Sequence, residues 1–128
     1  MKKALILFAV ISMLMSACNS GSKSKDAQAD PRSVAEAIFD AAKDGKYDGL
    51  AALIDADADK DSKMIANVAS DKELQKSFQE HFSKGKVNGD PVINGDNAEV
   101  KILFGPDGTR EETFNMVKKN GKWYLSSF

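Results

Sequence analysis

The sequence has very few of the residues that build disulfides and metal centres. Its 128 residues include one cysteine, Cys18, and one histidine, His81. A single cysteine cannot form an internal disulfide. The chain also shows no cluster of metal-ligating side chains, no glycine-rich phosphate loop and no histidine–carboxylate pair at a catalytic spacing. We therefore expect no metal, no cofactor and no catalytic residues, and so no enzyme.

An excess of positive charge is also missing. The chain has 18 lysines and arginines against 19 aspartates and glutamates, which is a net charge of −1. A surface that binds nucleic acid would show a clustered basic excess, so we expect no nucleic-acid partner. The length suits one domain and not two.

No hydrophobic run is long enough to cross a membrane. The apolar stretch Ala4–Leu14 is about half of the roughly 20 residues that a spanning helix needs. It follows Lys2 and Lys3 and precedes small residues, which is the pattern of a signal peptide. Ser16-Ala17-Cys18 then resembles a bacterial lipobox, with Met15 where this motif usually has leucine.

The lipobox resemblance implies a lipid anchor on Cys18. It implies that residues 1–17 are removed as a signal peptide and that the protein is held at the bacterial cell envelope. Asn19 follows the cysteine, in place of the aspartate that signals inner-membrane retention, which favours the outer membrane where the host has one. Residues 18–29 carry no large apolar side chain and are predicted to form a flexible tether. An ordinary secreted protein with an unmodified cysteine remains the alternative.

Residues 30–128 are predicted to form a single α+β domain, helices first. Asp30-Pro31 is typical of a helix start and Gly45 of a helix end. Between them, apolar residues recur at spacings of three and four, which predicts an amphipathic helix. A short second helix is expected over Tyr47–Ile54.

More helix is expected before the strands begin. One or two helical turns are predicted over Lys63–Ala69, capped by Asp61 or Ser62. Ser70-Asp71-Lys72-Glu73 has the form of a capping box, which predicts a helix that stops near Gly85.

Alternating aspartates over Asp55–Asp61 resemble the start of a calcium-binding loop. Lys60 lies where such a loop needs glycine, and Ala66 lies where it needs glutamate. We therefore interpret this segment as a solvated acidic loop.

The last third of the chain predicts four antiparallel strands in succession. They are expected over Val87–Ile93, Ala98–Phe104, Glu112–Lys118 and Trp123–Phe128. Gly89 and Pro91 interrupt the first, so it should lie at an edge or contain a bulge. Asn120-Gly121 suits a two-residue hairpin turn. That turn predicts the pairs Met116–Leu125, Val117–Tyr124 and Lys118–Trp123.

This order of parts resembles the nuclear-transport-factor-two-like superfamily, also called ketosteroid-isomerase-like or cystatin-like. The resemblance rests on Asp44-Gly45-Lys46-Tyr47-Asp48 after the first helix and on Asn120-Gly121-Lys122-Trp123-Tyr124 in the last hairpin. Within the superfamily the chain is similar to small bacterial lipoproteins with a lumazine-binding-like domain of unknown function. The resemblance implies a curved four-stranded sheet wrapped around the first helix as a cone, and it implies no particular activity.

Three functions remain open. The first is a non-enzymatic module whose cone binds a small apolar ligand or a peptide, and the second is an interaction or homodimerisation module that uses the outer face of the sheet. The third is a small-molecule isomerase or dehydratase, for which Asp40, Tyr47 and His81 could approach the cone mouth. The expected pocket lining is Ile38, Tyr47, Leu50, Phe78, Phe82, Ile102, Phe104, Phe114, Met116, Trp123 and Leu125. The expected interface is Leu103, Val117, Tyr124 and Phe128.

Overall fold

The computed structural model of this protein describes residues 26–128. The predicted signal peptide, Cys18 and most of the predicted tether lie outside the described residues. Within residues 26–128, no helix combines the length and the apolar character that crossing a membrane requires.

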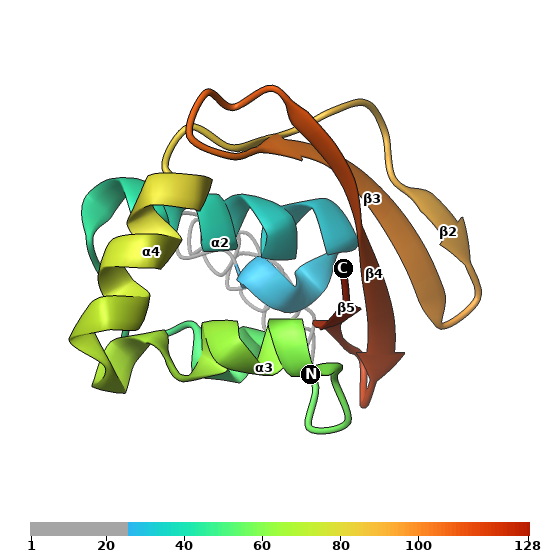
Figure 1. Ribbon diagram of the computed structural model, residues 1–128. Coiled ribbons are helices and arrows are strands. Elements are labelled where there is room, and N and C mark those ends of the chain that lie inside the picture. The colour runs from blue at the N-terminus through green and yellow to red at the C-terminus, as the bar shows by residue number, and fades with distance from the viewer. Residues whose placement is uncertain (1–25) are drawn as a thin grey trace, which may run out of the picture.

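Helices form one layer and an antiparallel sheet forms the other, so the predicted α+β class is confirmed (Figure 1). The α-helices are α2 (Pro31–Asp44), α3 (Lys60–Ala66) and α4 (Lys72–Phe82). Short 3-10 turns are η2 (Ala27–Ala29), η3 (Ala51–Leu53) and η4 (Val68–Ser70). The strands are β1 (Lys86–Val87), β2 (Val92–Asn94), β3 (Asn97–Phe104), β4 (Arg110–Lys119) and β5 (Lys122–Ser127).

Helix α2 begins and ends where the sequence predicts. The Asp30 side chain accepts a hydrogen bond of 2.9 Å from the backbone N–H of Ser33, and Pro31 occupies the first turn. Gly45 closes the helix in the left-handed conformation, with φ of 68°. These signals are confirmed because each acts within a few residues along the chain.

The other helix boundaries differ from the predicted ones. The helix expected over Tyr47–Ile54 is only the turn η3, because Ile54 takes an extended conformation and pairs with the sheet. Asp59 caps α3, so that helix starts earlier than predicted. Asp71 caps α4 in place of Ser70, which belongs to η4.

The sheet has the order β1-β3-β4-β5, and β2 pairs with β3 as well. The single strand predicted over residues 87–93 is therefore two short strands, β1 and β2, both on β3. Gly89, at φ of 89°, and Pro91 separate them. Pro91 cannot donate a ladder hydrogen bond, which is why the break falls there.

The final hairpin has the predicted register. Met116 pairs with Leu125, Val117 with Tyr124 and Lys118 with Trp123. Asn120 and Gly121 have φ of 54° and 79°, as a two-residue turn of this kind requires.

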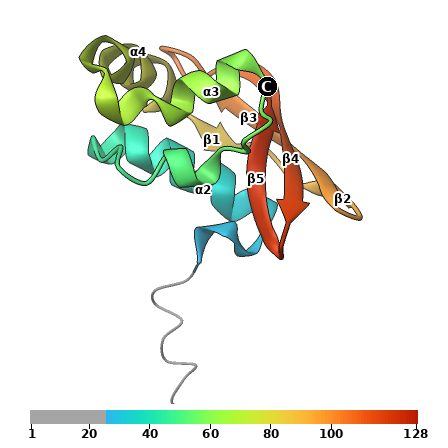
Figure 2. The same cartoon turned by 90° about the horizontal axis from the view of Figure 1, so that it is seen from below.

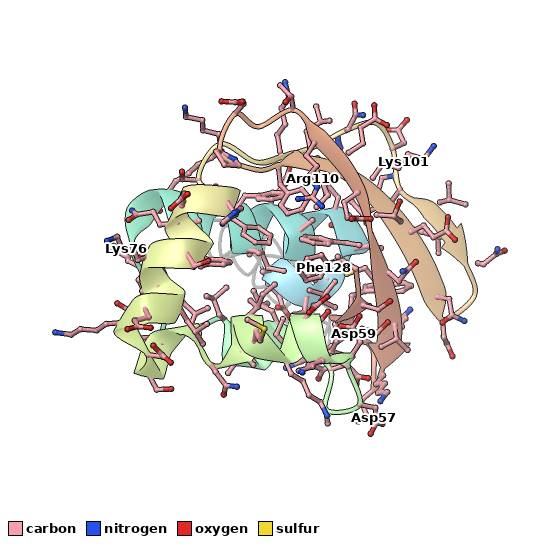
Figure 3. The ribbon with its side chains drawn as sticks, viewed as in Figure 1. Asp57, Asp59, Lys76, Lys101, Arg110 and Phe128 are labelled. Carbon is pink, nitrogen blue, oxygen red and sulfur yellow. The ribbon has the colours of Figure 1, made fainter. Side chains whose placement is uncertain are left out.

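A bulge near the end of β5 reverses the expected side of Phe128. The register shifts between Asn115 and Met116, so that Asn115 pairs with Ser127 and Ser126 is passed over. One extra residue inverts the alternation of side chains. Phe128 therefore points in among the helices instead of lying on the outer face, as Figure 3 shows.

The core lies between α2 and the concave side of the sheet. In Figure 1, β3 and β4 curve over α2, whose residues Val34, Ala35 and Ile38 are fully buried. Phe39 of the same helix stacks on Phe114 of β4 with ring centroids 5.8 Å apart. The interior of the predicted cone is thus filled by side chains along the length of α2.

The outer edge of β5 is covered by the segment between η3 and α3 (Figure 2). Ile54 forms a parallel bridge with Leu125, and the N–H groups of Asp55 and Asp59 donate to the carbonyls of Leu125 and Ser126, each at 2.9 Å. An exposed sheet edge invites pairing with other chains, and this segment occupies that edge.

The fold starts upstream of the boundary predicted at Asp30. Gln28 is buried, and its side-chain amide donates to the carbonyls of Ala52, at 2.9 Å, and Trp123, at 3.1 Å. These two hydrogen bonds hold η2 against η3 and β5. The domain therefore includes residues 26–29 of the predicted tether.

Candidate functional site

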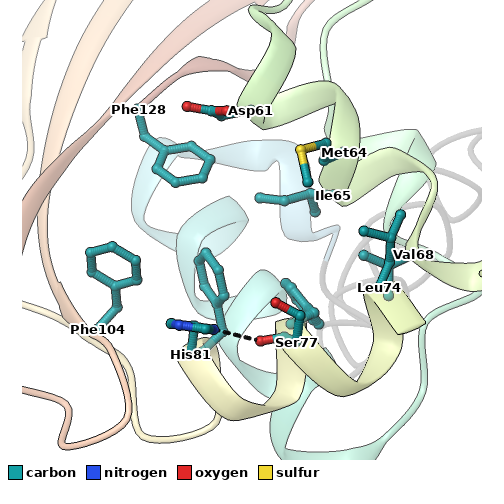
Figure 4. Close-up of a pocket in the computed structure, with 11 residues that line it drawn as sticks. Asp61, Met64, Ile65, Val68, Leu74, Ser77, His81, Phe104 and Phe128 are labelled. Atoms are coloured by element: carbon teal, nitrogen blue, oxygen red, sulfur yellow. Dashed lines mark hydrogen bonds between the residues drawn. The ribbon is translucent and has the colours of Figure 1, made fainter. Parts of the chain in front are cut away.

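A pocket of about 200 Å³ opens between α3 and α4, beside the hydrophobic core (Figure 4). We call it the α3–α4 pocket. Eight of its eleven lining residues are apolar and three are polar. The lining is Asp61, Met64, Ile65, Val68, Leu74, Ser77, Phe78, His81, Phe82, Phe104 and Phe128.

Helical spacing brings these side chains to one place. On α4, Leu74, Phe78 and Phe82 recur every four residues and form one stripe of the helix. On α3, Ile65 faces the same space, followed by Val68 in η4. The pocket is thus made where the apolar faces of two short helices meet without fully closing.

Aromatic rings form the end wall of the pocket. The Phe82 ring has centroid distances of 4.9 Å to Phe78, 5.3 Å to Phe104 and 6.0 Å to Phe128. Phe128 reaches this cluster because of the bulge in β5. The wall therefore combines a helix, the end of β3 and the end of the sheet's last strand.

His81 is held in a defined orientation at the rim. Its Nδ1 lies 2.8 Å from the backbone carbonyl of Ser77, one helical turn earlier. A carbonyl only accepts hydrogen bonds, so Nδ1 carries the proton and Nε2 is left as the acceptor in the neutral ring. The His81 backbone is held too, because its carbonyl accepts from the N–H of Gly105 at 2.6 Å.

Asp61 brings a carboxylate to the opposite side of the pocket. In Figure 4 it lies beside Phe128, across the pocket from His81. None of the ion pairs among residues 26–128 includes Asp61. The carboxylate is exposed at the rim, and solvent is its neighbour.

Asp61, Ser77 and His81 are the residue types of a serine-hydrolase triad, but their arrangement differs from one. In a triad the aspartate binds the histidine Nδ1 and thereby orients the ring toward the serine. Here the backbone carbonyl of Ser77 occupies Nδ1, and Asp61 lies across the pocket. The three side chains therefore lack the mutual contacts of a triad.

The residues predicted to line a pocket divide into two groups. Phe78, Phe82 and Phe104 line the α3–α4 pocket, and Tyr47 packs edge-on against Phe78 at 5.9 Å. The others are buried in the core, namely Ile38, Leu50, Ile102, Phe114, Met116, Trp123 and Leu125. The amphipathic pattern around Ile65 and Val68 was the signal in the sequence for the α3 side of the pocket.

The residues predicted to form an interface are also divided. Leu103, Val117 and Tyr124 are half-buried and lie on the outer face of the sheet. Phe128 is also half-buried, but it lies on the inner face, in the pocket wall.

The candidate catalytic residues do not converge. Asp40 is exposed on α2 and borders a different groove, with Asp44 and Lys46. His81 lies in the α3–α4 pocket, and Tyr47 lines neither. The structure therefore gives no shared site for the three side chains.

A wider groove of about 710 Å³ runs along the covered edge of β5. Its most notable feature is Lys119, whose Nζ lies 2.7 Å from the buried carboxylate of Asp55 and 3.3 Å from Asp57. The hydrogen bond to Asp55 raises the pKa of Lys119 above its ordinary value of 10.5, and Asp57 acts in the same direction. This lysine is engaged with the chain's own carboxylates, so we take the α3–α4 pocket as the candidate site. Among residues 26–128, no group of three or more histidine, aspartate or glutamate residues is placed to hold a metal ion.

Comparisons with known proteins give one solved structure. No family model matches the chain, and no curated protein matches it. A Campylobacter jejuni protein named as an NTF2-like transpeptidase is similar, with a TM-score of 0.49 and 19% sequence identity, over 77% of this chain and 98% of that one. At this level of similarity, the neighbour's name carries no information about the chemistry of this chain.

Proposed function

We propose that this protein is a lipid-anchored binding module of the bacterial cell envelope. In this proposal the α3–α4 pocket holds an apolar group of a small ligand or peptide and does not transform it. The observation that carries the proposal is a surface pocket of about 200 Å³ with eight apolar lining residues. Apolar lining with a few placed polar groups is the usual character of a ligand site.

The size of the pocket limits what it can hold. A cavity of about 150 Å³ takes one benzene ring, and sites for whole drug-sized ligands measure about 300–1,000 Å³. The α3–α4 pocket therefore suits one aromatic ring or one branched apolar side chain. The rest of a larger ligand or peptide would lie outside on the surface.

Two features support a binding role over a catalytic one. Isomerases and dehydratases need an acid or base set in an apolar site with a tuned pKa. The carboxylate of Asp61 is exposed at the rim, and Nδ1 of His81 is bound to a backbone carbonyl. Both groups are suited to orienting a ligand.

The location rests on the lipobox resemblance at Ser16-Ala17-Cys18. Labelling growing cells with a fatty-acid analogue tests it. The wild-type protein should take up the label, and Cys18→Ser should not. Absence of label from the wild-type protein would contradict the anchored location while leaving the pocket untouched.

The pocket is tested with a chain that begins at Asn19. The buried core runs from Val34 to Leu125, so this chain retains all of it. We expect phenethyl alcohol, a single-ring neutral probe, to bind and to shift the amide NMR signals of α3 and α4. Leu74→Trp should fill the pocket and abolish binding.

Lys76→Trp is the matched control for this test. Lys76 lies on the same helix, is exposed and points away from the pocket (Figure 3). This variant should bind the probe as the wild type does. Equal binding by both tryptophan variants, or no binding by the wild type, would refute the pocket as a ligand site.

A second candidate is self-association through the sheet. Val92 and Ile93 on β2 are 59% and 55% exposed, a large value for apolar side chains, and within residues 26–128 β2 pairs only with β3. Leu103, Val117 and Tyr124 lie half-buried on the outer face of the same sheet. Sedimentation should then show a dimer that Val92→Lys converts to a monomer. A monomer at all concentrations would exclude this candidate.

A further inference from the structure

We propose that the group bound in the α3–α4 pocket carries a protonated amine, so that the ligand is a small apolar amine or a peptide side chain of that kind. This inference rests on the proposed function and adds the charge of the ligand. It follows from the three polar lining residues, Asp61, Ser77 and His81, and from the aromatic wall.

The rim offers mostly hydrogen-bond acceptors. Asp61 presents a carboxylate with no ion-pair partner among residues 26–128. When its ring is neutral, His81 presents Nε2 as an acceptor, because Nδ1 donates to the Ser77 carbonyl at 2.8 Å. An ammonium group has three donors and no acceptor, so it matches such a rim better than a carboxylate does.

The aromatic wall favours the same charge. The faces of phenylalanine rings carry negative potential and attract cations within about 6 Å of the ring centroid. Phe128 lies next to Asp61 in Figure 4, so a cation near that carboxylate would also lie near a ring. One ring of this cluster makes such a contact within the chain, because the Arg110 guanidinium lies 5.5 Å from the centroid of Phe104.

An anionic ligand finds no matching charge on the lining. The eleven lining residues include one carboxylate and no lysine or arginine. A ligand carboxylate in the pocket would face Asp61 across it and would lose water without gaining a cationic partner. The order of affinity that we expect is therefore amine, then neutral alcohol, then carboxylate.

Three single-ring probes of nearly equal size test this order by calorimetry with the chain from Asn19. They are phenethylamine, phenethyl alcohol and hydrocinnamate, and they differ in the charge of the end group. Phenethylamine should bind about two- to fivefold more tightly than the alcohol, the range that one exposed ion pair contributes. Added salt should reduce this advantage, because Asp61 is at the surface.

Asp61→Asn separates the ion pair from the rest of the pocket. It should weaken the binding of phenethylamine more than the binding of phenethyl alcohol and so remove the preference for the amine. Asp57→Asn is the matched control, since it removes the same charge from the same acidic segment and Asp57 does not line the pocket. It should keep the preference for the amine.

The outcomes separate this inference from the function on which it rests. No binding of any probe would refute the proposed function. Binding of the alcohol or of hydrocinnamate at least as tightly as the amine would keep the pocket as a ligand site and refute the preference for an amine. An amine preference that survives Asp61→Asn would also refute the role assigned to this carboxylate.

Discussion

Gly85, just after α4, is the position where one added methyl group should disturb both the core and the pocket. Gly85 is buried, and a Cβ built on it would overlap the Phe39 ring. Phe39 cannot easily move, because its ring packs between Phe82 at 6.1 Å and Phe114 at 5.8 Å. Overpacking of this kind costs about 1–3 kcal/mol. We therefore expect Gly85→Ala to lower the free energy of unfolding by about 1–3 kcal/mol.

Urea unfolding followed by the fluorescence of Trp123, the single tryptophan, measures this loss. Gly49→Ala is the control, because its added Cβ would meet no atom within 4 Å. Removing a glycine at such a compatible site should leave stability unchanged or raise it by about 0.4–1 kcal/mol. Gly85→Ala should thus lower the free energy of unfolding, whereas Gly49→Ala should leave it unchanged or raise it.

A second substitution tests the cause. Phe39→Leu shortens the side chain that the new methyl group would strike, so Gly85→Ala should cost less in that background than in the wild type. Contacting residues couple by about 0.5–3 kcal/mol in such cycles. If Gly85→Ala is as stable as the wild type, or costs the same in both backgrounds, the overlap with Phe39 is not what makes glycine necessary.

Three further changes have defined outcomes. Ser62 is fully buried and its hydroxyl has no hydrogen-bond partner in the described structure, so Ser62→Ala should raise the free energy of unfolding by about 1 kcal/mol. A lower free energy of unfolding in this variant would contradict the absence of a partner. Gln28→Ala should cost about 1–3 kcal/mol, because it leaves the Trp123 carbonyl without its donor. Gln75→Ala, which removes a solvent-exposed hydrogen bond to the Ala69 carbonyl, should cost less. The pKa of Lys119 is raised in the folded protein, so its ion pair with Asp55 stabilises the fold at pH values below the ordinary lysine pKa of 10.5. This stabilisation is lost as the pH rises through the higher pKa that Lys119 has in the folded protein. Melting temperatures measured up to about pH 12 should therefore show that the wild type is more stable than Lys119→Met near neutral pH. The difference between the two melting temperatures should shrink above about pH 10.5. A difference that stays constant with pH would contradict the ion pair.

The sequence alone determined the elements whose causes lie within a few residues. Asp30-Pro31 and Gly45 bound α2 through local caps. Asn120-Gly121 sets the turn and with it the register of β4 and β5 from Lys118–Trp123 to Met116–Leu125. Pro91 breaks the first strand because it has no N–H to donate, wherever the rest of the chain lies.

Tertiary structure decided the features that depend on residues far apart in the chain. The alternation of side chains along the last strand predicts that Phe128 lies on the outer face of the sheet. Only the bulge opposite Asn115 brings it to the inner face. Asp55 reads as one more solvated aspartate in an acidic run, yet pairing of its segment with β5 buries it beside Lys119. The local sequence places Gln28 in the predicted tether, but its side-chain amide donates a hydrogen bond to the carbonyl of Trp123 and so belongs to the folded domain.

The pocket was the least predictable feature for the same reason. Alternation and helical spacing tell which side chains face inward, but they do not tell whether the inward faces meet tightly. Along α2 the inward faces of the helix and the sheet meet tightly, and Ile38 and Phe114 fill the interior of the cone. The short helices α3 and α4, in contrast, leave about 200 Å³ between them. The difference depends on how the two layers fit together in three dimensions, and that fit is a property of the tertiary structure.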